Sequence, residues 1–406
     1  MSTAPESDNE FARGWKVLAA SFLGIGVSLV SLVFYTAGIW IIPWQDAFGW
    51  TRAEIGFSAT LTTITLVLSA PFAGQLIDRF GLRTVSTLSL IFFAAGLLLV
   101  GRMNGNLWVF YGLTVAYTLV AVASTPLAFT RAVNAWFHKN RGMALGISLT
   151  STGVAAALLP LVLTPYVEQH GWRAGFALLS VIILVAVPII WLWIPDGGPE
   201  STGTTPVTQQ RIPEDSVRDI VSGIVFWRLA VIFFLIALAV CGLIPSFVPL
   251  LRDAGLSAET ASAYLAAIGV SVIAGRLVTG FLVDRIFAPY VTAAVFAFVS
   301  IGLMVFGFGG VGFALVGAVA LGFAIGAEVD LIGYYTARYF GMGRYGVLFG
   351  ILYSSFSVGC ALSPVIAGYI WDQTGSYDLA LKGAAVLVGG AVLLTLTLPQ
   401  FDQEMT

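Results

Sequence analysis

The feature that most constrains this chain is a series of apolar runs, each about 20 residues or longer and separated by short charged or turn-forming segments. A run of this length can span the hydrocarbon core of a bilayer as an α-helix, because a helix satisfies its backbone hydrogen bonds internally. Only 10% of the residues are charged, whereas a soluble domain has roughly 25%. The pattern therefore predicts an all-α integral membrane protein.

Twelve runs are predicted to span the membrane, in two groups of six. The first group covers residues 15–44, 50–78, 83–102, 106–135, 140–168 and 172–194. The second covers residues 224–252, 257–284, 289–309, 311–338, 344–372 and 378–398. The polar stretch between them is rich in Pro, Gly, Ser and Thr and predicts a flexible linker. We therefore expect a tail at 1–14, a six-helix half at 15–195, a linker at 196–222, a second half at 223–398 and a tail at 399–406.

The Lys and Arg residues predict the topology. With a cytoplasmic N-terminus, the inner side holds Arg13, Lys16, Arg79, Arg83, Arg131, Lys139, Arg141, Arg211, Arg218, Arg228, Arg285, Arg338 and Arg344. The outer side holds Arg52, Arg102, Arg173, Arg252 and Lys382. This imbalance follows the positive-inside rule and places both termini in the cytoplasm. We expect a multi-pass protein of the cell (inner) membrane, functional as a monomer.

The two groups of helices carry an internal repeat. The segment GQLIDRFGLR at 74–83 is echoed by GFLVDRIFAP at 280–289, and Asp78 and Asp284 are 206 residues apart. A second pair of segments, around Pro160 and Pro364, matches at an offset of 204. Two segments that agree on nearly one offset indicate duplicated halves. Parallel halves related by an axis along the membrane normal are typical of one large class of secondary transporters.

The segment GQLIDRFGLR resembles the loop motif of the major facilitator superfamily, and the resemblance extends over essentially the whole chain. It implies a fold of twelve transmembrane helices in two pseudo-symmetric halves, and transport by alternating access. The first copy of the motif contains Gly74, Asp78, Arg79, Gly81 and Arg83. The second copy keeps Asp284 and Arg285 but lacks the later glycine and basic residue. The resemblance implies that these residues act at the cytoplasmic gate.

A narrower resemblance is to the monocarboxylate porters and the related bacterial oxalate/formate exchangers. It is carried by AWFHKNRGMALGISLTSTG at 135–153, RYFGMGRYGVLFG at 338–350 and SPVIAGYIWDQTGSYD at 363–378. In that family an arginine of the eighth helix holds the substrate carboxylate, and the matching residue is Arg276. The chain departs from the family at three places. It has Val272 where animal members have an acid, Tyr35 near the place of a first-helix lysine, and no basic residue between 345 and 371.

Arg276 is the main candidate for anion binding. It lies nine residues before Arg285, or roughly 13 Å from the inner end of its helix. Its guanidinium is permanently charged and presents a planar fork of donors that matches a carboxylate. The alternative is a structural ion pair with Glu328 or Asp330. Arg131 is either a second cation of the cavity or a side chain that extends to the cytoplasm.

Glu328 and Asp330 are the candidates for proton coupling, because a carboxylate at mid-membrane depth costs roughly 2.5 kcal/mol or more. The two residues lie about 200° apart around a helix and cannot face the same way. We expect Glu328 to face the cavity and Asp330 to lie in a packed contact. Our hypothesis is that a solute anion displaces an acid from Arg276 and that the released acid takes up a proton. The alternative is a permanent Glu–Arg pair that never titrates.

The remaining expectations concern the lining of the cavity and the class of function. The residues expected to line the substrate site with Arg276 are Tyr35, Tyr117, Arg131, Thr150, Tyr353 and Ser354. No metalloprotease, hydrolase or nucleotide-binding motif is present, so we expect no enzyme activity, cofactor, metal or nucleic acid. The predicted function is proton-coupled transport of a small organic anion, most readily a monocarboxylate. The alternatives are organic anion exchange or proton-coupled transport of another small solute.

Overall fold

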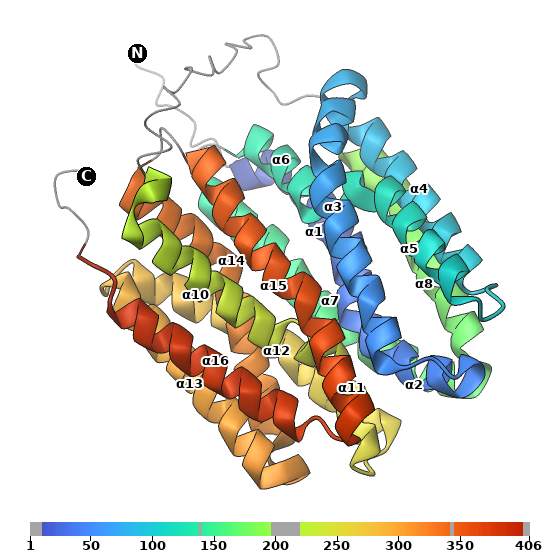
Figure 1. The fold of residues 1–406 in the computed structure, drawn as a ribbon. Coiled ribbons are helices and arrows are strands. Elements are labelled where there is room, and N and C mark those ends of the chain that lie inside the picture. Colours follow the sequence, from blue (N-terminus) through green and yellow to red (C-terminus); the bar gives the residue numbers. More distant parts are fainter. Residues whose placement is uncertain (1–9, 138–139, 196–219, 342–344, 401–406) are drawn as a thin grey trace, which may run out of the picture. The chain divides into compact units, whose positions relative to one another are not determined.

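The computed structural model describes residues 10–137, 140–195, 220–341 and 345–400, and every regular element within these ranges is a helix (Figure 1). Most of the predicted linker at 196–222 and parts of the two predicted tails lie outside the described residues. Four of the basic residues used for the topology also lie outside them, namely Lys139, Arg211, Arg218 and Arg344.

Eleven continuous helical stretches of the described residues are long and apolar enough to cross a bilayer. One of them, Ala288–Phe340, is 53 residues long. It contains two α-helices, α13 (Ala288–Gly309) and α14 (Ala314–Phe340), separated by the 3₁₀ turn η3 (Gly310–Phe313). With this stretch divided, there are twelve spans. The predicted all-helical, membrane-spanning fold class is confirmed.

Seven further spans are single α-helices with bounds close to those predicted. They are α3 (Arg52–Phe80), α4 (Leu82–Val100), α7 (Arg141–His170), α8 (Trp172–Trp193), α12 (Ala258–Val283), α15 (Tyr345–Thr374) and α16 (Asp378–Leu396). The turn between α3 and α4 depends on Gly81. Its φ of 84° lies in the left-handed region, which a glycine adopts without the strain of a side chain.

The first, fourth and seventh predicted spans are interrupted, although their sequences read as continuous apolar runs. The pieces are α1 (Glu10–Gly26), η1 (Val30–Phe34) and α2 (Tyr35–Phe48); α5 (Leu107–Ala121), η2 (Val122–Ser124) and α6 (Pro126–Trp136); and α10 (Ile224–Val240) and α11 (Leu243–Asp253). Local polar groups replace lost helical bonds at these breaks. The Ser31 hydroxyl donates to the carbonyl of Ile25 at 2.6 Å. Pro126 opens α6 at a position where its missing N–H costs nothing.

The described chain divides into two compact units. Unit 1 comprises residues 1–34, 68–155 and 166–205. Within it α1 packs against α6 and α8, and α4 packs against α5 and α8. Its core contains the fully buried Phe93, Phe129 and Phe137. A side chain at Gly24 would collide with the ring of Phe129, so this glycine permits the close packing of α1.

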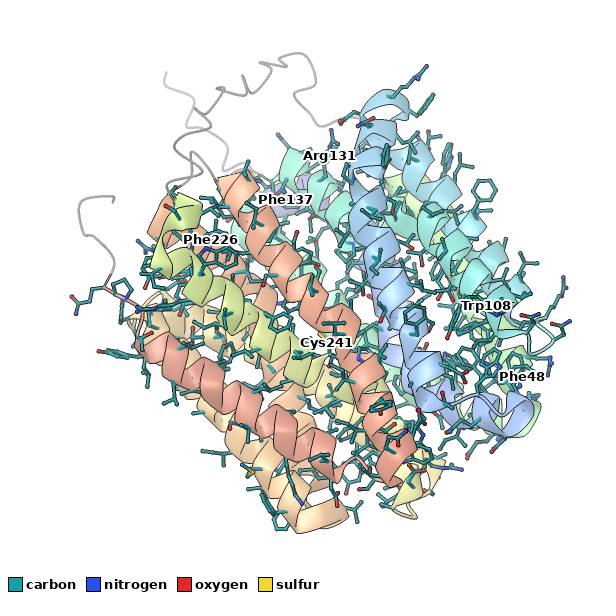
Figure 2. All side chains as sticks on the ribbon, viewed as in Figure 1. Phe48, Trp108, Arg131, Phe137, Phe226 and Cys241 are labelled. Carbon is teal, nitrogen blue, oxygen red and sulfur yellow. A yellow bond between two sulfur atoms is a disulfide. The ribbon has the colours of Figure 1, made fainter. Side chains whose placement is uncertain are left out.

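Unit 2 comprises residues 35–67, 156–165 and 206–406. Here α12 packs against α14, α13 against α16, α10 against α15, and α2 against α11 (Figure 1). A disulfide between Cys241 and Cys360 joins the end of α10 to α15. Figure 2 marks the two ends of α10 with Phe226 and Cys241. Residues 35–67 and 156–165 belong to the first predicted half, but they form one compact unit with the helices of the second half.

Large apolar side chains also cover exposed positions of the helices, as expected where lipid rather than water is the solvent. Examples are Trp108, which is 79% exposed, Phe308 at 72% and Leu192 at 70%. Figure 2 shows Trp108 near one end of unit 1. Together with the membrane-length helices, these side chains identify a multi-pass membrane protein.

Candidate functional site

Arg276 and Asp330 form an ion pair between α12 and α14. The Nε atom of Arg276 lies 3.0 Å from Oδ2 of Asp330. The two side chains differ in exposure, because that of Arg276 is 15% exposed and that of Asp330 is 40% exposed. The carboxylate is thus the more accessible member of the pair, and the guanidinium is mostly enclosed by protein.

Glycines bring the two helices together around this pair. A Cβ atom at Gly326 of α14 would lie 2.8 Å from the backbone nitrogen of Arg276 and would also collide with the carbonyl of Val272. A Cβ atom at Gly275 of α12 would lie 2.8 Å from the Cα atom of Phe323. Small residues at such a seam let two membrane helices approach to backbone contact. The side chains at 276 and 330 can therefore meet directly.

Substituting Gly326 with alanine should destabilise the α12–α14 seam by about 1–3 kcal/mol, because the added methyl group overpacks a backbone contact. The matched control is Gly350→Ala in α15, where an added Cβ atom has no neighbour within 4 Å. The measurement is the melting temperature of both variants in one detergent. Equal melting temperatures would contradict the packing described for Gly326.

Glu328 lies on another side of α14. It is 1% exposed, and its Oε1 atom has no hydrogen-bond partner among the described residues. The structure thus differs from our expectation that Glu328 would face the cavity and that Asp330 would be buried. The two residues do point in different directions, as their spacing requires, but the helix is rotated so that Asp330 meets Arg276. Close packing of Gly322 and Gly326 against α12 accounts for this rotation.

Tyrosines of the second half of α14 extend the polar surroundings of the pair. The Tyr334 hydroxyl donates to the carbonyl of Val283 at 3.0 Å and joins α14 to the end of α12. The fully buried Tyr335 donates to the Thr292 hydroxyl at 2.8 Å and joins α14 to α13. Sequence reasoning did not select either contact, and both fix the axial position of α14 on which Asp330 depends.

Two of the hydroxyl-bearing candidates bond within their own helices. The hydroxyl of Thr150 donates to the carbonyl of Ile147 at 2.6 Å, and that of Ser354 donates to Gly350 at 2.8 Å, so both bind to their own helices. A Ser or Thr hydroxyl in a helix commonly bonds to a backbone carbonyl of the preceding turn. In unit 1, the buried ring of Tyr117 packs 5.9 Å from that of Phe93.

Two aromatic candidates lie in unit 2. Tyr35 is buried at the start of α2. Tyr353 is half-buried on α15, and its ring stacks on that of Phe349 at a centroid distance of 5.8 Å. Phe349 in turn stacks on Tyr345, whose hydroxyl lies near Gly333, three residues after Asp330. The row formed by Tyr345, Phe349 and Tyr353 thus runs along α15 next to the stretch of α14 that follows Asp330.

Arg131 belongs to a different group of charges in unit 1. Its Nη2 atom lies 2.5 Å from Oδ1 of Asp78, and both side chains are more than half exposed. Figure 2 shows Arg131 on α6, near the end of unit 1 opposite to Trp108. The structure therefore joins Arg131 to the predicted loop motif rather than to a second anion-binding position.

Most of the other residues of the two motif copies lie near the ends of α3 and α12 or at the start of α4. Arg83 stacks over the ring of Trp191 at 4.3 Å. In the second copy, Arg285 lies 3.6 Å from the ring centroid of Phe281 and donates to its carbonyl at 3.0 Å. Asp284 is exposed at the end of α12. Gly74 lies in the helical part of α3, and Arg79 lies over Phe80.

Sequence reasoning missed a charged cluster around the buried side chain of Arg52, which we had assigned only to the outer side. Arg52 is 3% exposed and forms an ion pair with Asp253 at 2.7 Å. One signal was available in the sequence. Arg52, Asp253 and Asp372 all lie at span ends that the topology places on one side of the membrane, so they can meet despite separations of 201 and 320 residues.

Comparison with known proteins gives one family and one fold. The model of the Major Facilitator Superfamily matches residues 22–364. Monocarboxylate transporter 11 of Homo sapiens is 25% identical over 419 residues, which cover 98% of this chain and 85% of that protein. The uncharacterized transporter YcxA of Bacillus subtilis is 24% identical, with 96% of each chain covered.

A solved structure agrees with this fold. A bacterial homologue of the human lysosomal transporter Spinster, in an inward-facing and unoccupied conformation, superposes with a TM-score of 0.70. The alignment covers 97% of this chain and 95% of the other at 17% identity. At that identity the likeness concerns the fold alone.

Proposed function

The chain belongs to the Major Facilitator Superfamily of secondary transporters, and we propose that its solute is a small organic monocarboxylate carried together with a proton. The family consists of transporters and not of enzymes. The proposal includes the predicted location in the cell (inner) membrane with both termini in the cytoplasm. It also includes function as a monomer, with no cofactor or metal.

The observation that carries the proposal is the ion pair between Arg276 and Asp330. Its cation is largely enclosed and its carboxylate is 40% exposed. A solute carboxylate has the same charge and the same two acceptor oxygens as Asp330, so it can replace Asp330 on the guanidinium. Arginine suits this exchange because its planar fork binds a carboxylate through two parallel hydrogen bonds.

Replacement of Asp330 links the anion to a proton. A carboxylate released from Arg276 inside the span loses the cation that balances its charge, and an isolated charge at membrane depth is costly. Uptake of one proton by Asp330 neutralises it. The loaded protein then holds one solute anion on Arg276 and one proton on Asp330, and the net charge of the site is unchanged. Alternating access would move both across the membrane in one step.

The relatives support the class of solute. Proteins named monocarboxylate transporters 11 and 13 match 94–98% of this chain at about a quarter identity. The sequence resemblance implied an acid on the eighth helix one turn before the arginine, where this chain has Val272. In unit 2 that acid is supplied by α14 instead, since Asp330 occupies the guanidinium. The proposal therefore replaces Glu328 with Asp330 as the proton acceptor.

The test uses purified protein in liposomes with an acidic exterior and a pH-sensitive dye inside. Hydroxylated monocarboxylates are preferred as solutes, because their neutral forms cross lipid slowly. We expect internal acidification that requires both the added carboxylate and Arg276. Dicarboxylates and the matching neutral amides should give no more acidification than protein-free liposomes.

Two further outcomes separate the alternatives. Exchange of internal for external labelled carboxylate without proton movement would identify an organic anion exchanger and would overturn the proton-coupled proposal. Proton movement with a neutral solute, and none with any carboxylate, would identify a proton-coupled porter of another solute. In that case Arg276 would have a role other than anion binding.

A further inference from the structure

The side chain of Arg52, the first residue of α3, is enclosed by partners on every side. Its Nη1 and Nη2 atoms donate to the two carboxylate oxygens of Asp253 at 2.7 and 2.9 Å, and its Nε atom donates to Gln45 at 2.9 Å. The guanidinium also lies 3.5 Å from the ring centroid of Trp371 and donates to the Tyr377 hydroxyl at 3.1 Å. Burial raises the pKa of Tyr377, so its hydroxyl is neutral.

The backbone at the start of α3 is bound as well. Asp372, in the last turn of α15, accepts the N–H groups of Arg52 and Ala53 at 3.0 and 2.9 Å. A carboxylate at this position satisfies free N–H groups and stabilises the positive end of the helix dipole. We call Gln45, Arg52, Asp253, Trp371, Asp372 and Tyr377 the Arg52 cluster.

Beyond the cluster, α3 and α15 remain in backbone contact. A Cβ atom at Gly368 would lie 2.6 Å from the backbone nitrogen of Ala53, and one at Gly56 would lie 2.7 Å from the carbonyl of Pro364. The Thr60 hydroxyl donates to the carbonyl of Ala361. The contact thus extends over more than two helical turns from the charged cluster.

A second seam in unit 2 joins α7 to α12 through neutral hydroxyl groups. Ser262 of α12 donates to the Thr164 hydroxyl of α7 at 2.6 Å, and both side chains are buried. Among the described residues, the contacts α2–α11, α3–α15 and α7–α12 thus join helices of the first predicted half to helices of the second. The buried guanidinium of Arg52 lies at the start of α3 and bonds to Asp253 at the end of α11, so it shares no residue with the α7–α12 bond.

We propose that the Arg52 cluster is the latch that holds the outer end of the solute path closed, and that its ion pair must break each time the path opens outward. The cluster lies at the span ends that the Lys and Arg distribution assigns to the outside. Helix ends joined this tightly cannot part while Arg52 is bound, because separation from Asp253 leaves the buried guanidinium without its charged partner. The proposal rests on alternating access and on this topology, and not on the identity of the solute.

The test measures closure at the second seam, away from the latch itself. Cysteines replace Thr164 and Ser262 in a Cys241→Ala/Cys360→Ala background, and their rate of oxidative cross-linking reports how much of the protein is closed. Arg52→Gln should shift the closed–open equilibrium toward the open state by about tenfold or more, because the closed state loses the ion pair of its buried guanidinium, and the cross-linking rate should fall with the closed fraction. The matched control is Arg102→Gln, which removes an exposed arginine predicted on the same side.

A charge-swapped variant keeps the test independent of folding defects. Arg52→Glu combined with Asp253→Arg should recover most of the cross-linking rate. Absence of recovery in a double variant whose melting temperature matches the parent would overturn the latch. An unchanged rate in Arg52→Gln, or an equal loss in Arg102→Gln, would also overturn it.

The side of the membrane is tested separately and needs no solute. Glu259 is exposed in the first turn of α12 and is predicted to lie outside. Glu259→Cys should react with a membrane-impermeant maleimide in intact cells. Protection in intact cells with reaction in lysed cells would place the cluster on the cytoplasmic side and overturn the outer assignment. Because neither measurement uses transport, a failed latch and a failed monocarboxylate proposal can be distinguished.

Discussion

Arg276→Ala is expected to raise the half-saturation concentration of the transported carboxylate by about 30-fold or more, equivalent to about 2 kcal/mol or more of lost binding energy. The substitution removes the guanidinium that holds Asp330 at 3.0 Å and that we propose holds the solute. The measurement is the initial rate of carboxylate-dependent acidification in liposomes over a range of solute concentrations. An unchanged half-saturation concentration would exclude Arg276 as the anion site.

Two controls separate binding from folding. Arg276→Lys retains the charge but offers no planar fork, so we expect weak transport with a large rise in half-saturation concentration. Arg276→Ala combined with Asp330→Asn leaves no unpaired charge at the seam. The double variant should therefore melt closer to the parent than Arg276→Ala does, yet it should not transport. Recovery of transport in the double variant would make the arginine a structural partner of Asp330 only.

The number and positions of the spans could be predicted because hydrophobic length is a local property. Each apolar run had to form a helix long enough for the bilayer, and the bounds of α7 and α12 differ from the predicted bounds by no more than two residues. The interruptions of the first, fourth and seventh spans could not be predicted in this way. The breaks near Ser31, Ser124 and Gly242 fall within apolar runs, where hydropathy is insensitive to a change in helical hydrogen bonding.

The candidate site could be predicted only in part, because sequence does not determine the rotation of a helix. Arg276, Glu328 and Asp330 were all selected, since any charge inside an apolar span is unusual. Which acid faces the arginine depends on the contacts of Gly322 and Gly326 with the backbone of α12. We expected Asp330 to lie in a packed contact and Glu328 to face the cavity. The structure shows that the packed seam and the ion pair are neighbours on one interface.

The surface charges were harder to assign because their partners are distant in sequence. Arg131 lies 53 residues from Asp78, and Arg52 lies 201 residues from Asp253. Position along a span places each residue at a membrane face but does not select its partner there. Arg52 therefore read as an ordinary arginine of the outer side, although its side chain is among the most enclosed charged groups of the described residues.

Asp330→Asn is expected to uncouple the anion from the proton. An asparagine cannot take up a proton when the solute displaces it from Arg276, so carboxylate-driven acidification should fall to the level of protein-free liposomes. Exchange of labelled carboxylate should persist, and its half-saturation concentration should fall by about tenfold, since no competing carboxylate remains on the guanidinium. Both quantities are measured on the same liposome preparation.

Glu328→Gln is the matched comparison, because it changes the other acid of α14 to its neutral amide at nearly constant volume. Glu328 is 1% exposed and belongs to no ion pair among the described residues. A buried carboxyl group without a cation is stable only in its neutral form, so the amide replaces a group of the same charge. Acidification should therefore be retained in Glu328→Gln and lost in Asp330→Asn. The reverse result would return the proton to Glu328 and would require α14 to rotate during transport, since in this conformation its packed glycines turn Asp330 toward Arg276.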